Sequence, residues 1–350
     1  MKTTVLTLAL GFALAAPVSA ASLSDVFSGY YVFGDSLSDD GNLFERTSLL
    51  SPDGSGRPPA PYFDGRFTNG LVFSELLAAD FDSANTENYA FGGATALGGT
   101  GGMIDNLTTQ LGNFLTDSAL TDTGERPLVS IWVGANDILQ SVASADLFST
   151  SIAAAMAVGD AIETLANDGA SSITDFVVFT LPDIGMSAQF AELNFNNADL
   201  TPGDDATDFA VASQLQAAAT AAVQLYNHTL IDELGLLSAT GLNIYTVDAF
   251  ALLTEAQADP DSFGLINSTS PCLYVDPEET PDGVFPYCGP DLAKQYLFFD
   301  GVHPSSTIHA RLADEVRAAI VPLPGGLPLL GGAMLGLGFV MSRRRDARAT

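Results

Sequence analysis

Short apolar runs alternate along the chain with longer segments of helical periodicity. Continuous apolar runs rich in β-branched residues are typical of strands buried on both faces of a sheet. Such runs predict five strands, at residues 30–33, 87–91, 127–133, 175–180 and 242–247. Apolar positions spaced three and four residues apart predict the main helices, at residues 71–79, 103–115, 149–167, 206–233 and 305–320.

This alternation of strands and helices predicts an α/β fold. We expect a three-layer α/β/α sandwich around a mostly parallel five-stranded sheet, built as one domain over residues 21–320. Residues 43–67 and 259–290 are rich in Pro and Gly and are expected to be irregular. The second of these segments precedes the last motif of the chain, so we expect it beside the functional site.

Residues 1–20 have the features of a secretory signal peptide. Lys2 supplies a positive start, an apolar stretch follows from Thr4 to Ala16, and the small residues of a cleavage site end at Ala20. The apolar stretch is short for a membrane span. The sequence therefore predicts export, with cleavage after Ala20.

The other end of the chain, residues 321–350, also has the pattern of a processing signal. A Pro-containing motif at 321–324 precedes an apolar, Gly-rich run, and arginines at 343–345 follow it. This order resembles the bacterial sorting tags of the PEP-CTERM type, in the variant that begins Val-Pro-Leu-Pro, although Gly325 stands where Ala is usual. The resemblance implies transient membrane insertion and cleavage by an exosortase-type enzyme. A retained C-terminal anchor is the alternative.

The charge of the chain limits its partners. The formal net charge is −30 at pH 7, and the sequence pI is about 4.1. Such a field repels phosphate backbones and anionic membrane surfaces, so we expect no nucleic-acid partner. Only 15% of residues are charged, which fits a globular domain better than a disordered acidic chain.

The chain has two cysteines, Cys272 and Cys288. In an exported protein, a disulfide that closes this short loop is the default expectation. No nearby residue supplies a base for a catalytic thiol. Cys and His at the spacing of a metal site are absent from the sequence, so no metal is expected.

Ser36 is the first candidate for chemistry. It follows the predicted strand 30–33 and a turn at Gly34, and ligands collect at the carboxyl ends of strands in open α/β sheets. On this local pattern alone, a helix N-cap is the better explanation of the serine. A nucleophilic serine needs a base, which is usually a histidine.

One of the three histidines has suitable surroundings. His228 and His309 lie inside predicted helices, whereas His303 lies in a loop before the last helix. Asp300 precedes it by three residues, where a carboxylate can bond the imidazole and fix its tautomer. The Asp-x-x-His pattern by itself is weak, because an Asx turn beside a solvated histidine has the same spacing.

Four short blocks follow one another along the chain, each at the end of a predicted strand or before a helix: residues 34–39 (GDSLSD), 88–94 (NYAFGGA), 134–137 (GAND) and 300–304 (DGVHP). They resemble the sequence blocks of the GDSL or SGNH hydrolases. Residues 65–70 (GRFTNG) are similar to a stretch common in the lipase and esterase branch. The resemblance covers residues 28–320 and implies the flavodoxin-like SGNH-hydrolase fold.

The resemblance also implies roles for the matching residues. Ser36 would be the nucleophile, His303 the general base and then the acid, and Asp300 the residue that orients His303. The backbone N–H groups of Ser36 and Gly93 and the side-chain amide of Asn136 would form the oxyanion hole. Four further polar residues are expected to support the site through hydrogen bonds: Asp35, Asp39, Asn42 and Asp137.

The sequence thus predicts an exported serine esterase or lipase that forms an acyl-enzyme on Ser36, without a metal or cofactor. Its substrate would be a small acyl ester or a lipid such as a lysophospholipid. The expected location is the cell surface, the extracellular matrix or the medium of a bacterium of the Gram-negative type. Two alternatives remain: a carbohydrate O-acetylesterase that acts on exopolysaccharide, and a non-catalytic surface or matrix protein that retains the fold.

Overall fold

A computed structural model describes residues 22–99, 102–119, 122–168, 173–190, 206–274 and 287–320. The elements below belong to one unit, Leu23–Ile320. The predicted signal peptide, residues 1–20, and the predicted sorting segment, residues 321–350, lie outside the described residues.

The five predicted strands form the central sheet. They are β1 (Gly29–Gly34), β2 (Thr86–Asn88), β3 (Pro127–Trp132), β4 (Asp175–Phe179) and β5 (Asn243–Val247). Their order is β2-β1-β3-β4-β5, and every neighbouring pair is parallel. Every residue of β1, β3 and β4 is buried, because helices cover both faces. The predicted fold class is confirmed.

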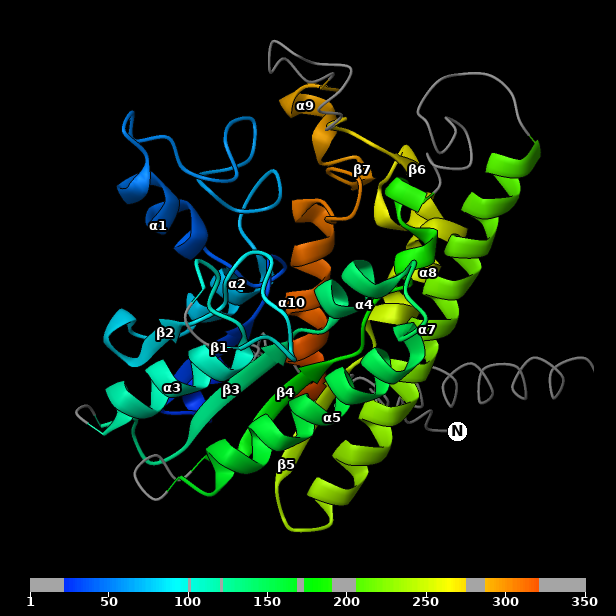
Figure 1. Cartoon of the computed structure of the whole chain (residues 1–350). Helices are drawn as coiled ribbons and strands as arrows, with labels where there is room; N and C mark the ends of the chain where they lie inside the picture. The colour runs from blue at the N-terminus through cyan, green and yellow to red at the C-terminus, as the bar shows by residue number, and fades with distance from the viewer. Residues whose placement is uncertain are drawn as a thin grey trace, which may run out of the picture. The chain divides into compact units, whose positions relative to one another are not determined.

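Helices cover the two faces of this sheet (Figure 1). On one face, α2 (Phe73–Ala78) packs against α10 (Ser306–Ile320), which also contacts β5. The other face carries α3 (Leu107–Ser118), α5 (Leu147–Ala166) and α7 (Ala206–Ser238), and α5 and α7 pack along each other. The three layers enclose a core that includes Trp132, Phe73, Phe179 and Tyr226.

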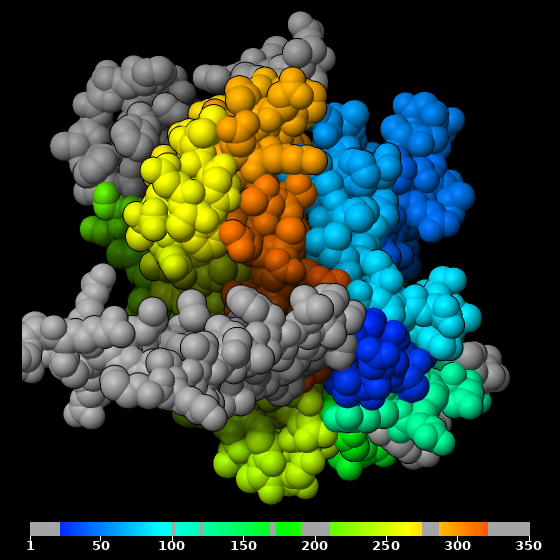
Figure 2. Space-filling view, turned by 180° about the vertical axis from the view of Figure 1, so that it is seen from behind, coloured from blue at the N-terminus to red at the C-terminus, as the bar shows by residue number. Residues whose placement is uncertain are grey.

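Shorter elements connect these layers. They are α4 (Ala135–Ser141), α8 (Ala249–Ala258), α9 (Pro290–Ala293) and the 3₁₀ turns η1 (Leu23–Asp25), η2 (Ser83–Asn85) and η3 (Ile184–Met186). Seen from behind, residues 287–320 lie between the segment that leads to α2 and the segment that contains α8 (Figure 2).

The prediction that residues 43–67 are irregular is wrong at their start, where the structure has α1 (Asn42–Leu50). Asp39 accepts hydrogen bonds from three successive backbone N–H groups at the beginning of this helix. The helix buries only Leu43 and Thr47. Two of its apolar residues, Leu49 and Leu50, are exposed, so the apolar positions do not mark one buried face.

The second segment expected to be irregular, residues 259–290, is also partly ordered. It contains η4 (Pro260–Phe263) and β6 (Asn267–Pro271), which pairs in parallel with β7 (Tyr296–Phe298) as a small second sheet. The sequence of β6, Asn-Ser-Thr-Ser-Pro, has no apolar run by which a strand is recognised. Residues 275–286 lie outside the described part of the chain.

The strand order determines where a site can form. With the order 2-1-3-4-5, the connections leave β1 and β3 toward opposite sides of the sheet, and a crevice opens between the carboxyl ends of these two strands. Asp35 and Ser36 follow β1 directly, and Gly134 to Asn136 follow β3. The first and third sequence blocks are therefore neighbours in space.

Candidate active site

Ser36 lies on a turn that directly follows β1. The backbone N–H groups of Ser38 and Asp39 both donate to the carbonyl of Asp35, which closes the turn. The helix after it begins only at Asn42, with Gly41 as its N-cap. An N-cap role therefore does not explain Ser36.

The side chains of Ser36, His303 and Asp300 are hydrogen-bonded in series. The distance from Ser36 Oγ to His303 Nε2 is 2.8 Å, and that from His303 Nδ1 to Asp300 Oδ2 is 2.7 Å. An ionised carboxylate can only accept, so Nδ1 carries the hydrogen and Nε2 is free to accept from the serine hydroxyl. The backbone N–H groups of Val302 and His303 donate to the other oxygen, Asp300 Oδ1, at 2.9 and 2.7 Å.

The charges of this pair are coupled. Burial by itself would raise the pKa of Asp300, but His303 and hydrogen bonds to the carboxylate hold this pKa below its ordinary value. Burial would lower the pKa of His303, but the neighbouring Asp300 carboxylate outweighs it and raises the pKa above its ordinary value. The arrangement keeps Asp300 ionised and makes His303 a better proton acceptor.

Tyr62 is a further contact to this series that sequence reasoning did not find. Its hydroxyl donates to Asp300 Oδ2 at 2.5 Å, the same oxygen that His303 contacts. Its ring packs edge-on against Phe299, with ring centroids 5.1 Å apart. Tyr62 lies in the Pro-rich segment before α2 and is 238 residues away from Asp300 in sequence, so no local pattern relates the two.

The GRFTNG stretch, residues 65–70, holds the loop that carries His303. The Thr68 hydroxyl donates to the carbonyl of Pro304 at 2.9 Å, and the Asn69 side chain accepts from the backbone N–H of Ser306 at 2.8 Å. Phe67 lies against the imidazole of His303, with ring centroids 5.0 Å apart. This stretch therefore fixes both the loop and the ring.

Gly93 and Asn136 line the same cavity as Ser36. Gly93 has a φ of +80°, which glycine adopts at little cost, and a Cβ there would meet Ile104 at 3.0 Å. Asn136 lies in the first turn of α4, and its Nδ2 donates one hydrogen bond, 2.9 Å long, to the carbonyl of Ala94. An amide nitrogen has two hydrogens, so one remains for a ligand oxygen.

The four residues expected to support the site all bond to backbone groups. Asp35 accepts from Leu37, and Asp137 accepts from Ala96 and Leu97. Asn42 donates to the carbonyls of Asn88 and Ala90. Asp39 accepts from Gly92 as well as from the start of α1, so it ties the Ser36 turn to the glycine next to Gly93.

Gln110 holds the end of β1 from the neighbouring helix α3. Its amide oxygen accepts from the backbone N–H of Gly34 at 2.9 Å, and its amide nitrogen donates to the Gly34 carbonyl at 2.8 Å. The side chain is fully buried. A single glutamine within an apolar helical pattern gave no indication of this role.

Cys272 and Cys288 form the predicted disulfide, with their Cα atoms 5.0 Å apart. It lies in a small apolar cluster with Phe299, the residue before Asp300, and Tyr62 packs against this cluster. The backbone of Leu273 also donates to the carbonyl of Phe299 at 2.7 Å. The disulfide and Leu273 therefore support the loop at the Asp300 end of the series.

The other two histidines have no part in this arrangement. His228 is exposed on α7, 3.3 Å from Asp232. His309 is buried in α10, where it accepts from the backbone N–H of Phe73, and burial lowers its pKa to about 3. It is therefore a neutral core residue.

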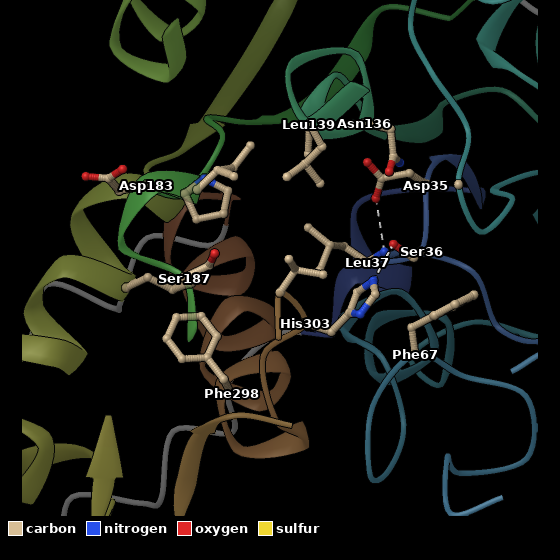
Figure 3. A pocket seen from close by; sticks show the side chains of 16 residues that line it. Asp35, Ser36, Leu37, Phe67, Asn136, Leu139, Asp183, Ser187, Phe298 and His303 are labelled. Carbon is tan, nitrogen blue, oxygen red and sulfur yellow. Dashed lines mark hydrogen bonds between the residues drawn. The ribbon is translucent and has the colours of Figure 1, made fainter. Parts of the chain in front are cut away.

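A cavity of about 240 Å³ opens beside Ser36 and His303 (Figure 3). Apolar side chains from six segments of the chain form most of its wall: Leu37, Phe67, Leu139, Ile184, Leu253, Phe298 and Val302. In the part of the chain that the structure describes, no group of three His, Cys, Asp or Glu side chains is placed to hold a metal ion. No described helix has both the length and the hydropathy to cross a membrane.

The fold and this site define a class of proteins: hydrolases with a three-layer α/β/α fold in which a serine, a histidine and a carboxylate are hydrogen-bonded in series. The family model for GDSL-like lipases and acylhydrolases matches residues 30–316. The chain belongs to this family and is a carboxylic ester hydrolase.

Relatives of this chain include a phosphatidylcholine-sterol acyltransferase from Aeromonas hydrophila, which is 26% identical over 88% of this chain and 94% of its own length. A thermolabile hemolysin from Vibrio parahaemolyticus is 25% identical over 85% of this chain and 65% of its own. Among solved structures, a carbohydrate acetylesterase from Sinorhizobium meliloti aligns over 83% of this chain and 96% of its own, with 15% identity and a TM-score of 0.40.

Proposed function

We propose that the protein is an exported serine esterase that hydrolyses esters with an apolar acyl group, through an acyl-enzyme on Ser36. One observation carries the proposal: the hydrogen-bonded series of Ser36, His303 and Asp300 lies at the wall of an apolar cavity.

In the first half of the reaction, Ser36 Oγ attacks the ester carbonyl while His303 Nε2 takes the hydroxyl proton. Asp300 holds the imidazole in the correct tautomer and stabilises the imidazolium that forms. His303 then gives the proton to the departing alcohol. In the second half a water molecule replaces the alcohol, and the same proton transfers release the acid and restore Ser36.

The negative charge that develops on the carbonyl oxygen needs donors already in place. The backbone N–H groups of Ser36 and Gly93 and the second amide hydrogen of Asn136 are the proposed donors. Asn136→Ala removes one of them, and we expect kcat to fall about 100- to 1,000-fold, as for a lost oxyanion donor. A much smaller loss would show that Asn136 is not a donor to the oxyanion.

The apolar wall of the cavity favours a substrate with an apolar acyl group over an acetylated sugar. Each methylene that enters an apolar site contributes about 0.8 kcal/mol. The name of the Aeromonas relative refers to phosphatidylcholine and sterol, and this supports a lipid-like substrate. An acetylated sugar would place only one methyl group against the cavity wall.

Export is part of the proposal. It is supported by the signal-like residues 1–20 and by the hemolysin among the relatives. We further propose that the tail, residues 321–350, inserts transiently into the membrane and is cut by an exosortase-type enzyme.

A panel of substrates tests the proposal: nitrophenyl esters from acetate to palmitate, acetylated sugars and a lysophospholipid. We expect kcat/KM to rise from acetate to hexanoate until the cavity is filled. Ser36→Ala should abolish hydrolysis, whereas Ser38→Ala, two residues away on the same turn, should retain most of it. Faster hydrolysis of acetylated sugars would instead favour the O-acetylesterase, and no hydrolysis at all would favour the non-catalytic surface protein.

A further inference from the structure

The cavity beside Ser36 has one polar feature that the reaction does not use. Apart from the groups around Ser36, the described residues that line the cavity include two with polar side chains, Asp183 and Ser187. Asp183 accepts a hydrogen bond from the hydroxyl of Thr220 at 2.7 Å, and its carboxylate points away from the cavity (Figure 3). Ser187 is the exception.

Ser187 presents its hydroxyl to the cavity. It follows the 3₁₀ turn η3, and its backbone N–H is bonded to the carbonyl of Ile184 at 3.0 Å, which fixes its place. The residue is 4% exposed, and its Oγ has no hydrogen-bond partner among the described residues. Figure 3 shows this oxygen directed toward the space between Phe298 and Leu37, on the side of the cavity opposite Ser36.

A buried hydroxyl without a partner is unfavourable, so most such groups in proteins are hydrogen-bonded. A ligand atom that bonds to it regains the lost interaction. A site of this kind discriminates strongly, because a ligand that lacks the matching group leaves the buried hydroxyl unpaired.

We propose that Ser187 forms a polar subsite within the apolar cavity and binds a hydroxyl or oxo substituent on the acyl chain of the substrate. The proposal rests on the proposed esterase function and specifies its substrate class: oxygen-substituted acyl esters. The acyl group is the part concerned, because it remains covalently bound through both halves of the reaction while the alcohol must leave. A hydroxyl such as that of Ser187 can donate to an oxo group and exchange hydrogen bonds with a hydroxyl.

The test compares matched ethyl esters of hexanoate and of hexanoates that carry one hydroxyl at position 3, 4, 5 or 6, because nitrophenyl esters of 4- and 5-hydroxy acids would form lactones without enzyme. The measured quantity is the ratio of kcat/KM for each hydroxylated ester to kcat/KM for plain hexanoate. At one position of the hydroxyl, we expect this ratio to fall roughly three- to tenfold in Ser187→Ala, the effect of one neutral hydrogen bond. Ser187→Thr, which keeps the hydroxyl, should retain most of the wild-type ratio.

Thr109→Val is the matched control. The Thr109 hydroxyl also lacks a partner among the described residues, but it lies on α3 and does not line the cavity. Its removal should leave the ratio at the wild-type value for every ester. Thermal unfolding of each variant confirms that the comparison concerns folded protein.

The outcomes separate the subsite from the reaction itself. The subsite is overturned if Ser187→Ala leaves all the ratios unchanged. This holds whether the variant keeps the wild-type rates or slows plain and hydroxylated esters by the same factor, as a merely structural serine would. In both cases the esterase proposal stands, because the wild type still hydrolyses hexanoate and Ser36→Ala does not. If the wild type hydrolyses none of the esters, the proposed function fails and the subsite fails with it.

Discussion

At the scale of single residues, the hydroxyl of Tyr62 determines how strongly Asp300 acts on His303. It donates to the oxygen that His303 also contacts, and this lowers the pKa of Asp300. In Tyr62→Phe that oxygen loses a donor, so its charge attracts the imidazolium more strongly and the pKa of His303 rises further. His303 must be neutral to act as a base, so we expect the acid limb of the kcat/KM profile to move to higher pH, with a reduced kcat.

Tyr287→Phe is the control for this measurement, because Tyr287 packs against the same Phe299 ring, with centroids 6.1 Å apart. It should leave the position of the acid limb unchanged. An unchanged limb in Tyr62→Phe as well, or a shift to lower pH, would show that Tyr62 has no electrostatic part in the site.

The buried carboxyl group of Asp35 makes the stability of the protein depend on pH. Burial raises its pKa from 3.8 to about 7, and its Oδ2 has no hydrogen-bond partner among the described residues. The carboxyl group of Asp35 ionises near pH 4 in the unfolded chain and only near pH 7 in the folded protein. The folded protein therefore loses stability relative to the unfolded chain as the pH rises between these values. Asp35→Asn keeps the acceptor for Leu37 and removes the charge.

We therefore expect Asp35→Asn to gain stability over the wild type as the pH rises, by a few kcal/mol at pH 8, since each pKa unit corresponds to about 1.4 kcal/mol. Urea unfolding at pH 4, 6 and 8 measures the difference. A difference that is the same at all three values would contradict the raised pKa of Asp35.

The residues that could be predicted from sequence are those within short motifs. Ser36, Asp300 and His303 each stand in a block whose neighbours mark it, and Asn136 follows a strand whose apolar run is clear. Tyr62 and Gln110 could not be found in this way, because their partners are brought to them only by the fold, over 238 residues for Tyr62 and 76 for Gln110.

At the scale of elements, the disulfide supports the loop that carries Asp300 and His303. It closes a separation of 16 residues, and such a loop contributes roughly 3 kcal/mol to stability. We expect the double variant Cys272→Ala, Cys288→Ala to unfold at lower temperature and to have a lower kcat, because Phe299 and Tyr62 pack on this cluster.

Treatment of the wild type with a reductant should reproduce both changes, whereas the double variant should not respond to it. Scanning calorimetry and ester hydrolysis measure the two effects. A variant that loses stability but keeps the full kcat would show that the disulfide does not position the site.

Elements with a strong apolar pattern were predictable, and those with a weak one were not. β1, β3 and β4 are buried on both faces and so have continuous apolar sequences. α1 buries two residues and depends on Asp39 for its start, and β6 is polar and pairs with a strand 25 residues or more away. These elements depend on tertiary contacts that local pattern does not encode.

At the scale of the whole molecule, the net charge of −30 predicts how the proposed hydrolysis of lipids depends on the charge of the lipid surface. Like charges repel over about 10 Å at 0.1 M salt and over shorter distances at higher salt. We expect slower hydrolysis on vesicles with anionic phospholipid than on purely zwitterionic ones, and a difference that shrinks between 50 mM and 500 mM NaCl. Rates on the two vesicle types that do not depend on salt would exclude this electrostatic effect.

The central claim is that Ser36 is the nucleophile, activated by His303. Reaction with a fluorophosphonate, followed by proteolysis and mass mapping, tests it most directly, because the reagent forms a stable bond only with an activated serine. The account predicts modification of the peptide that contains Ser36 in the wild type, strongly reduced modification in His303→Ala, and none in Ser36→Ala. Modification of a different serine, or labelling that persists in Ser36→Ala, would contradict it.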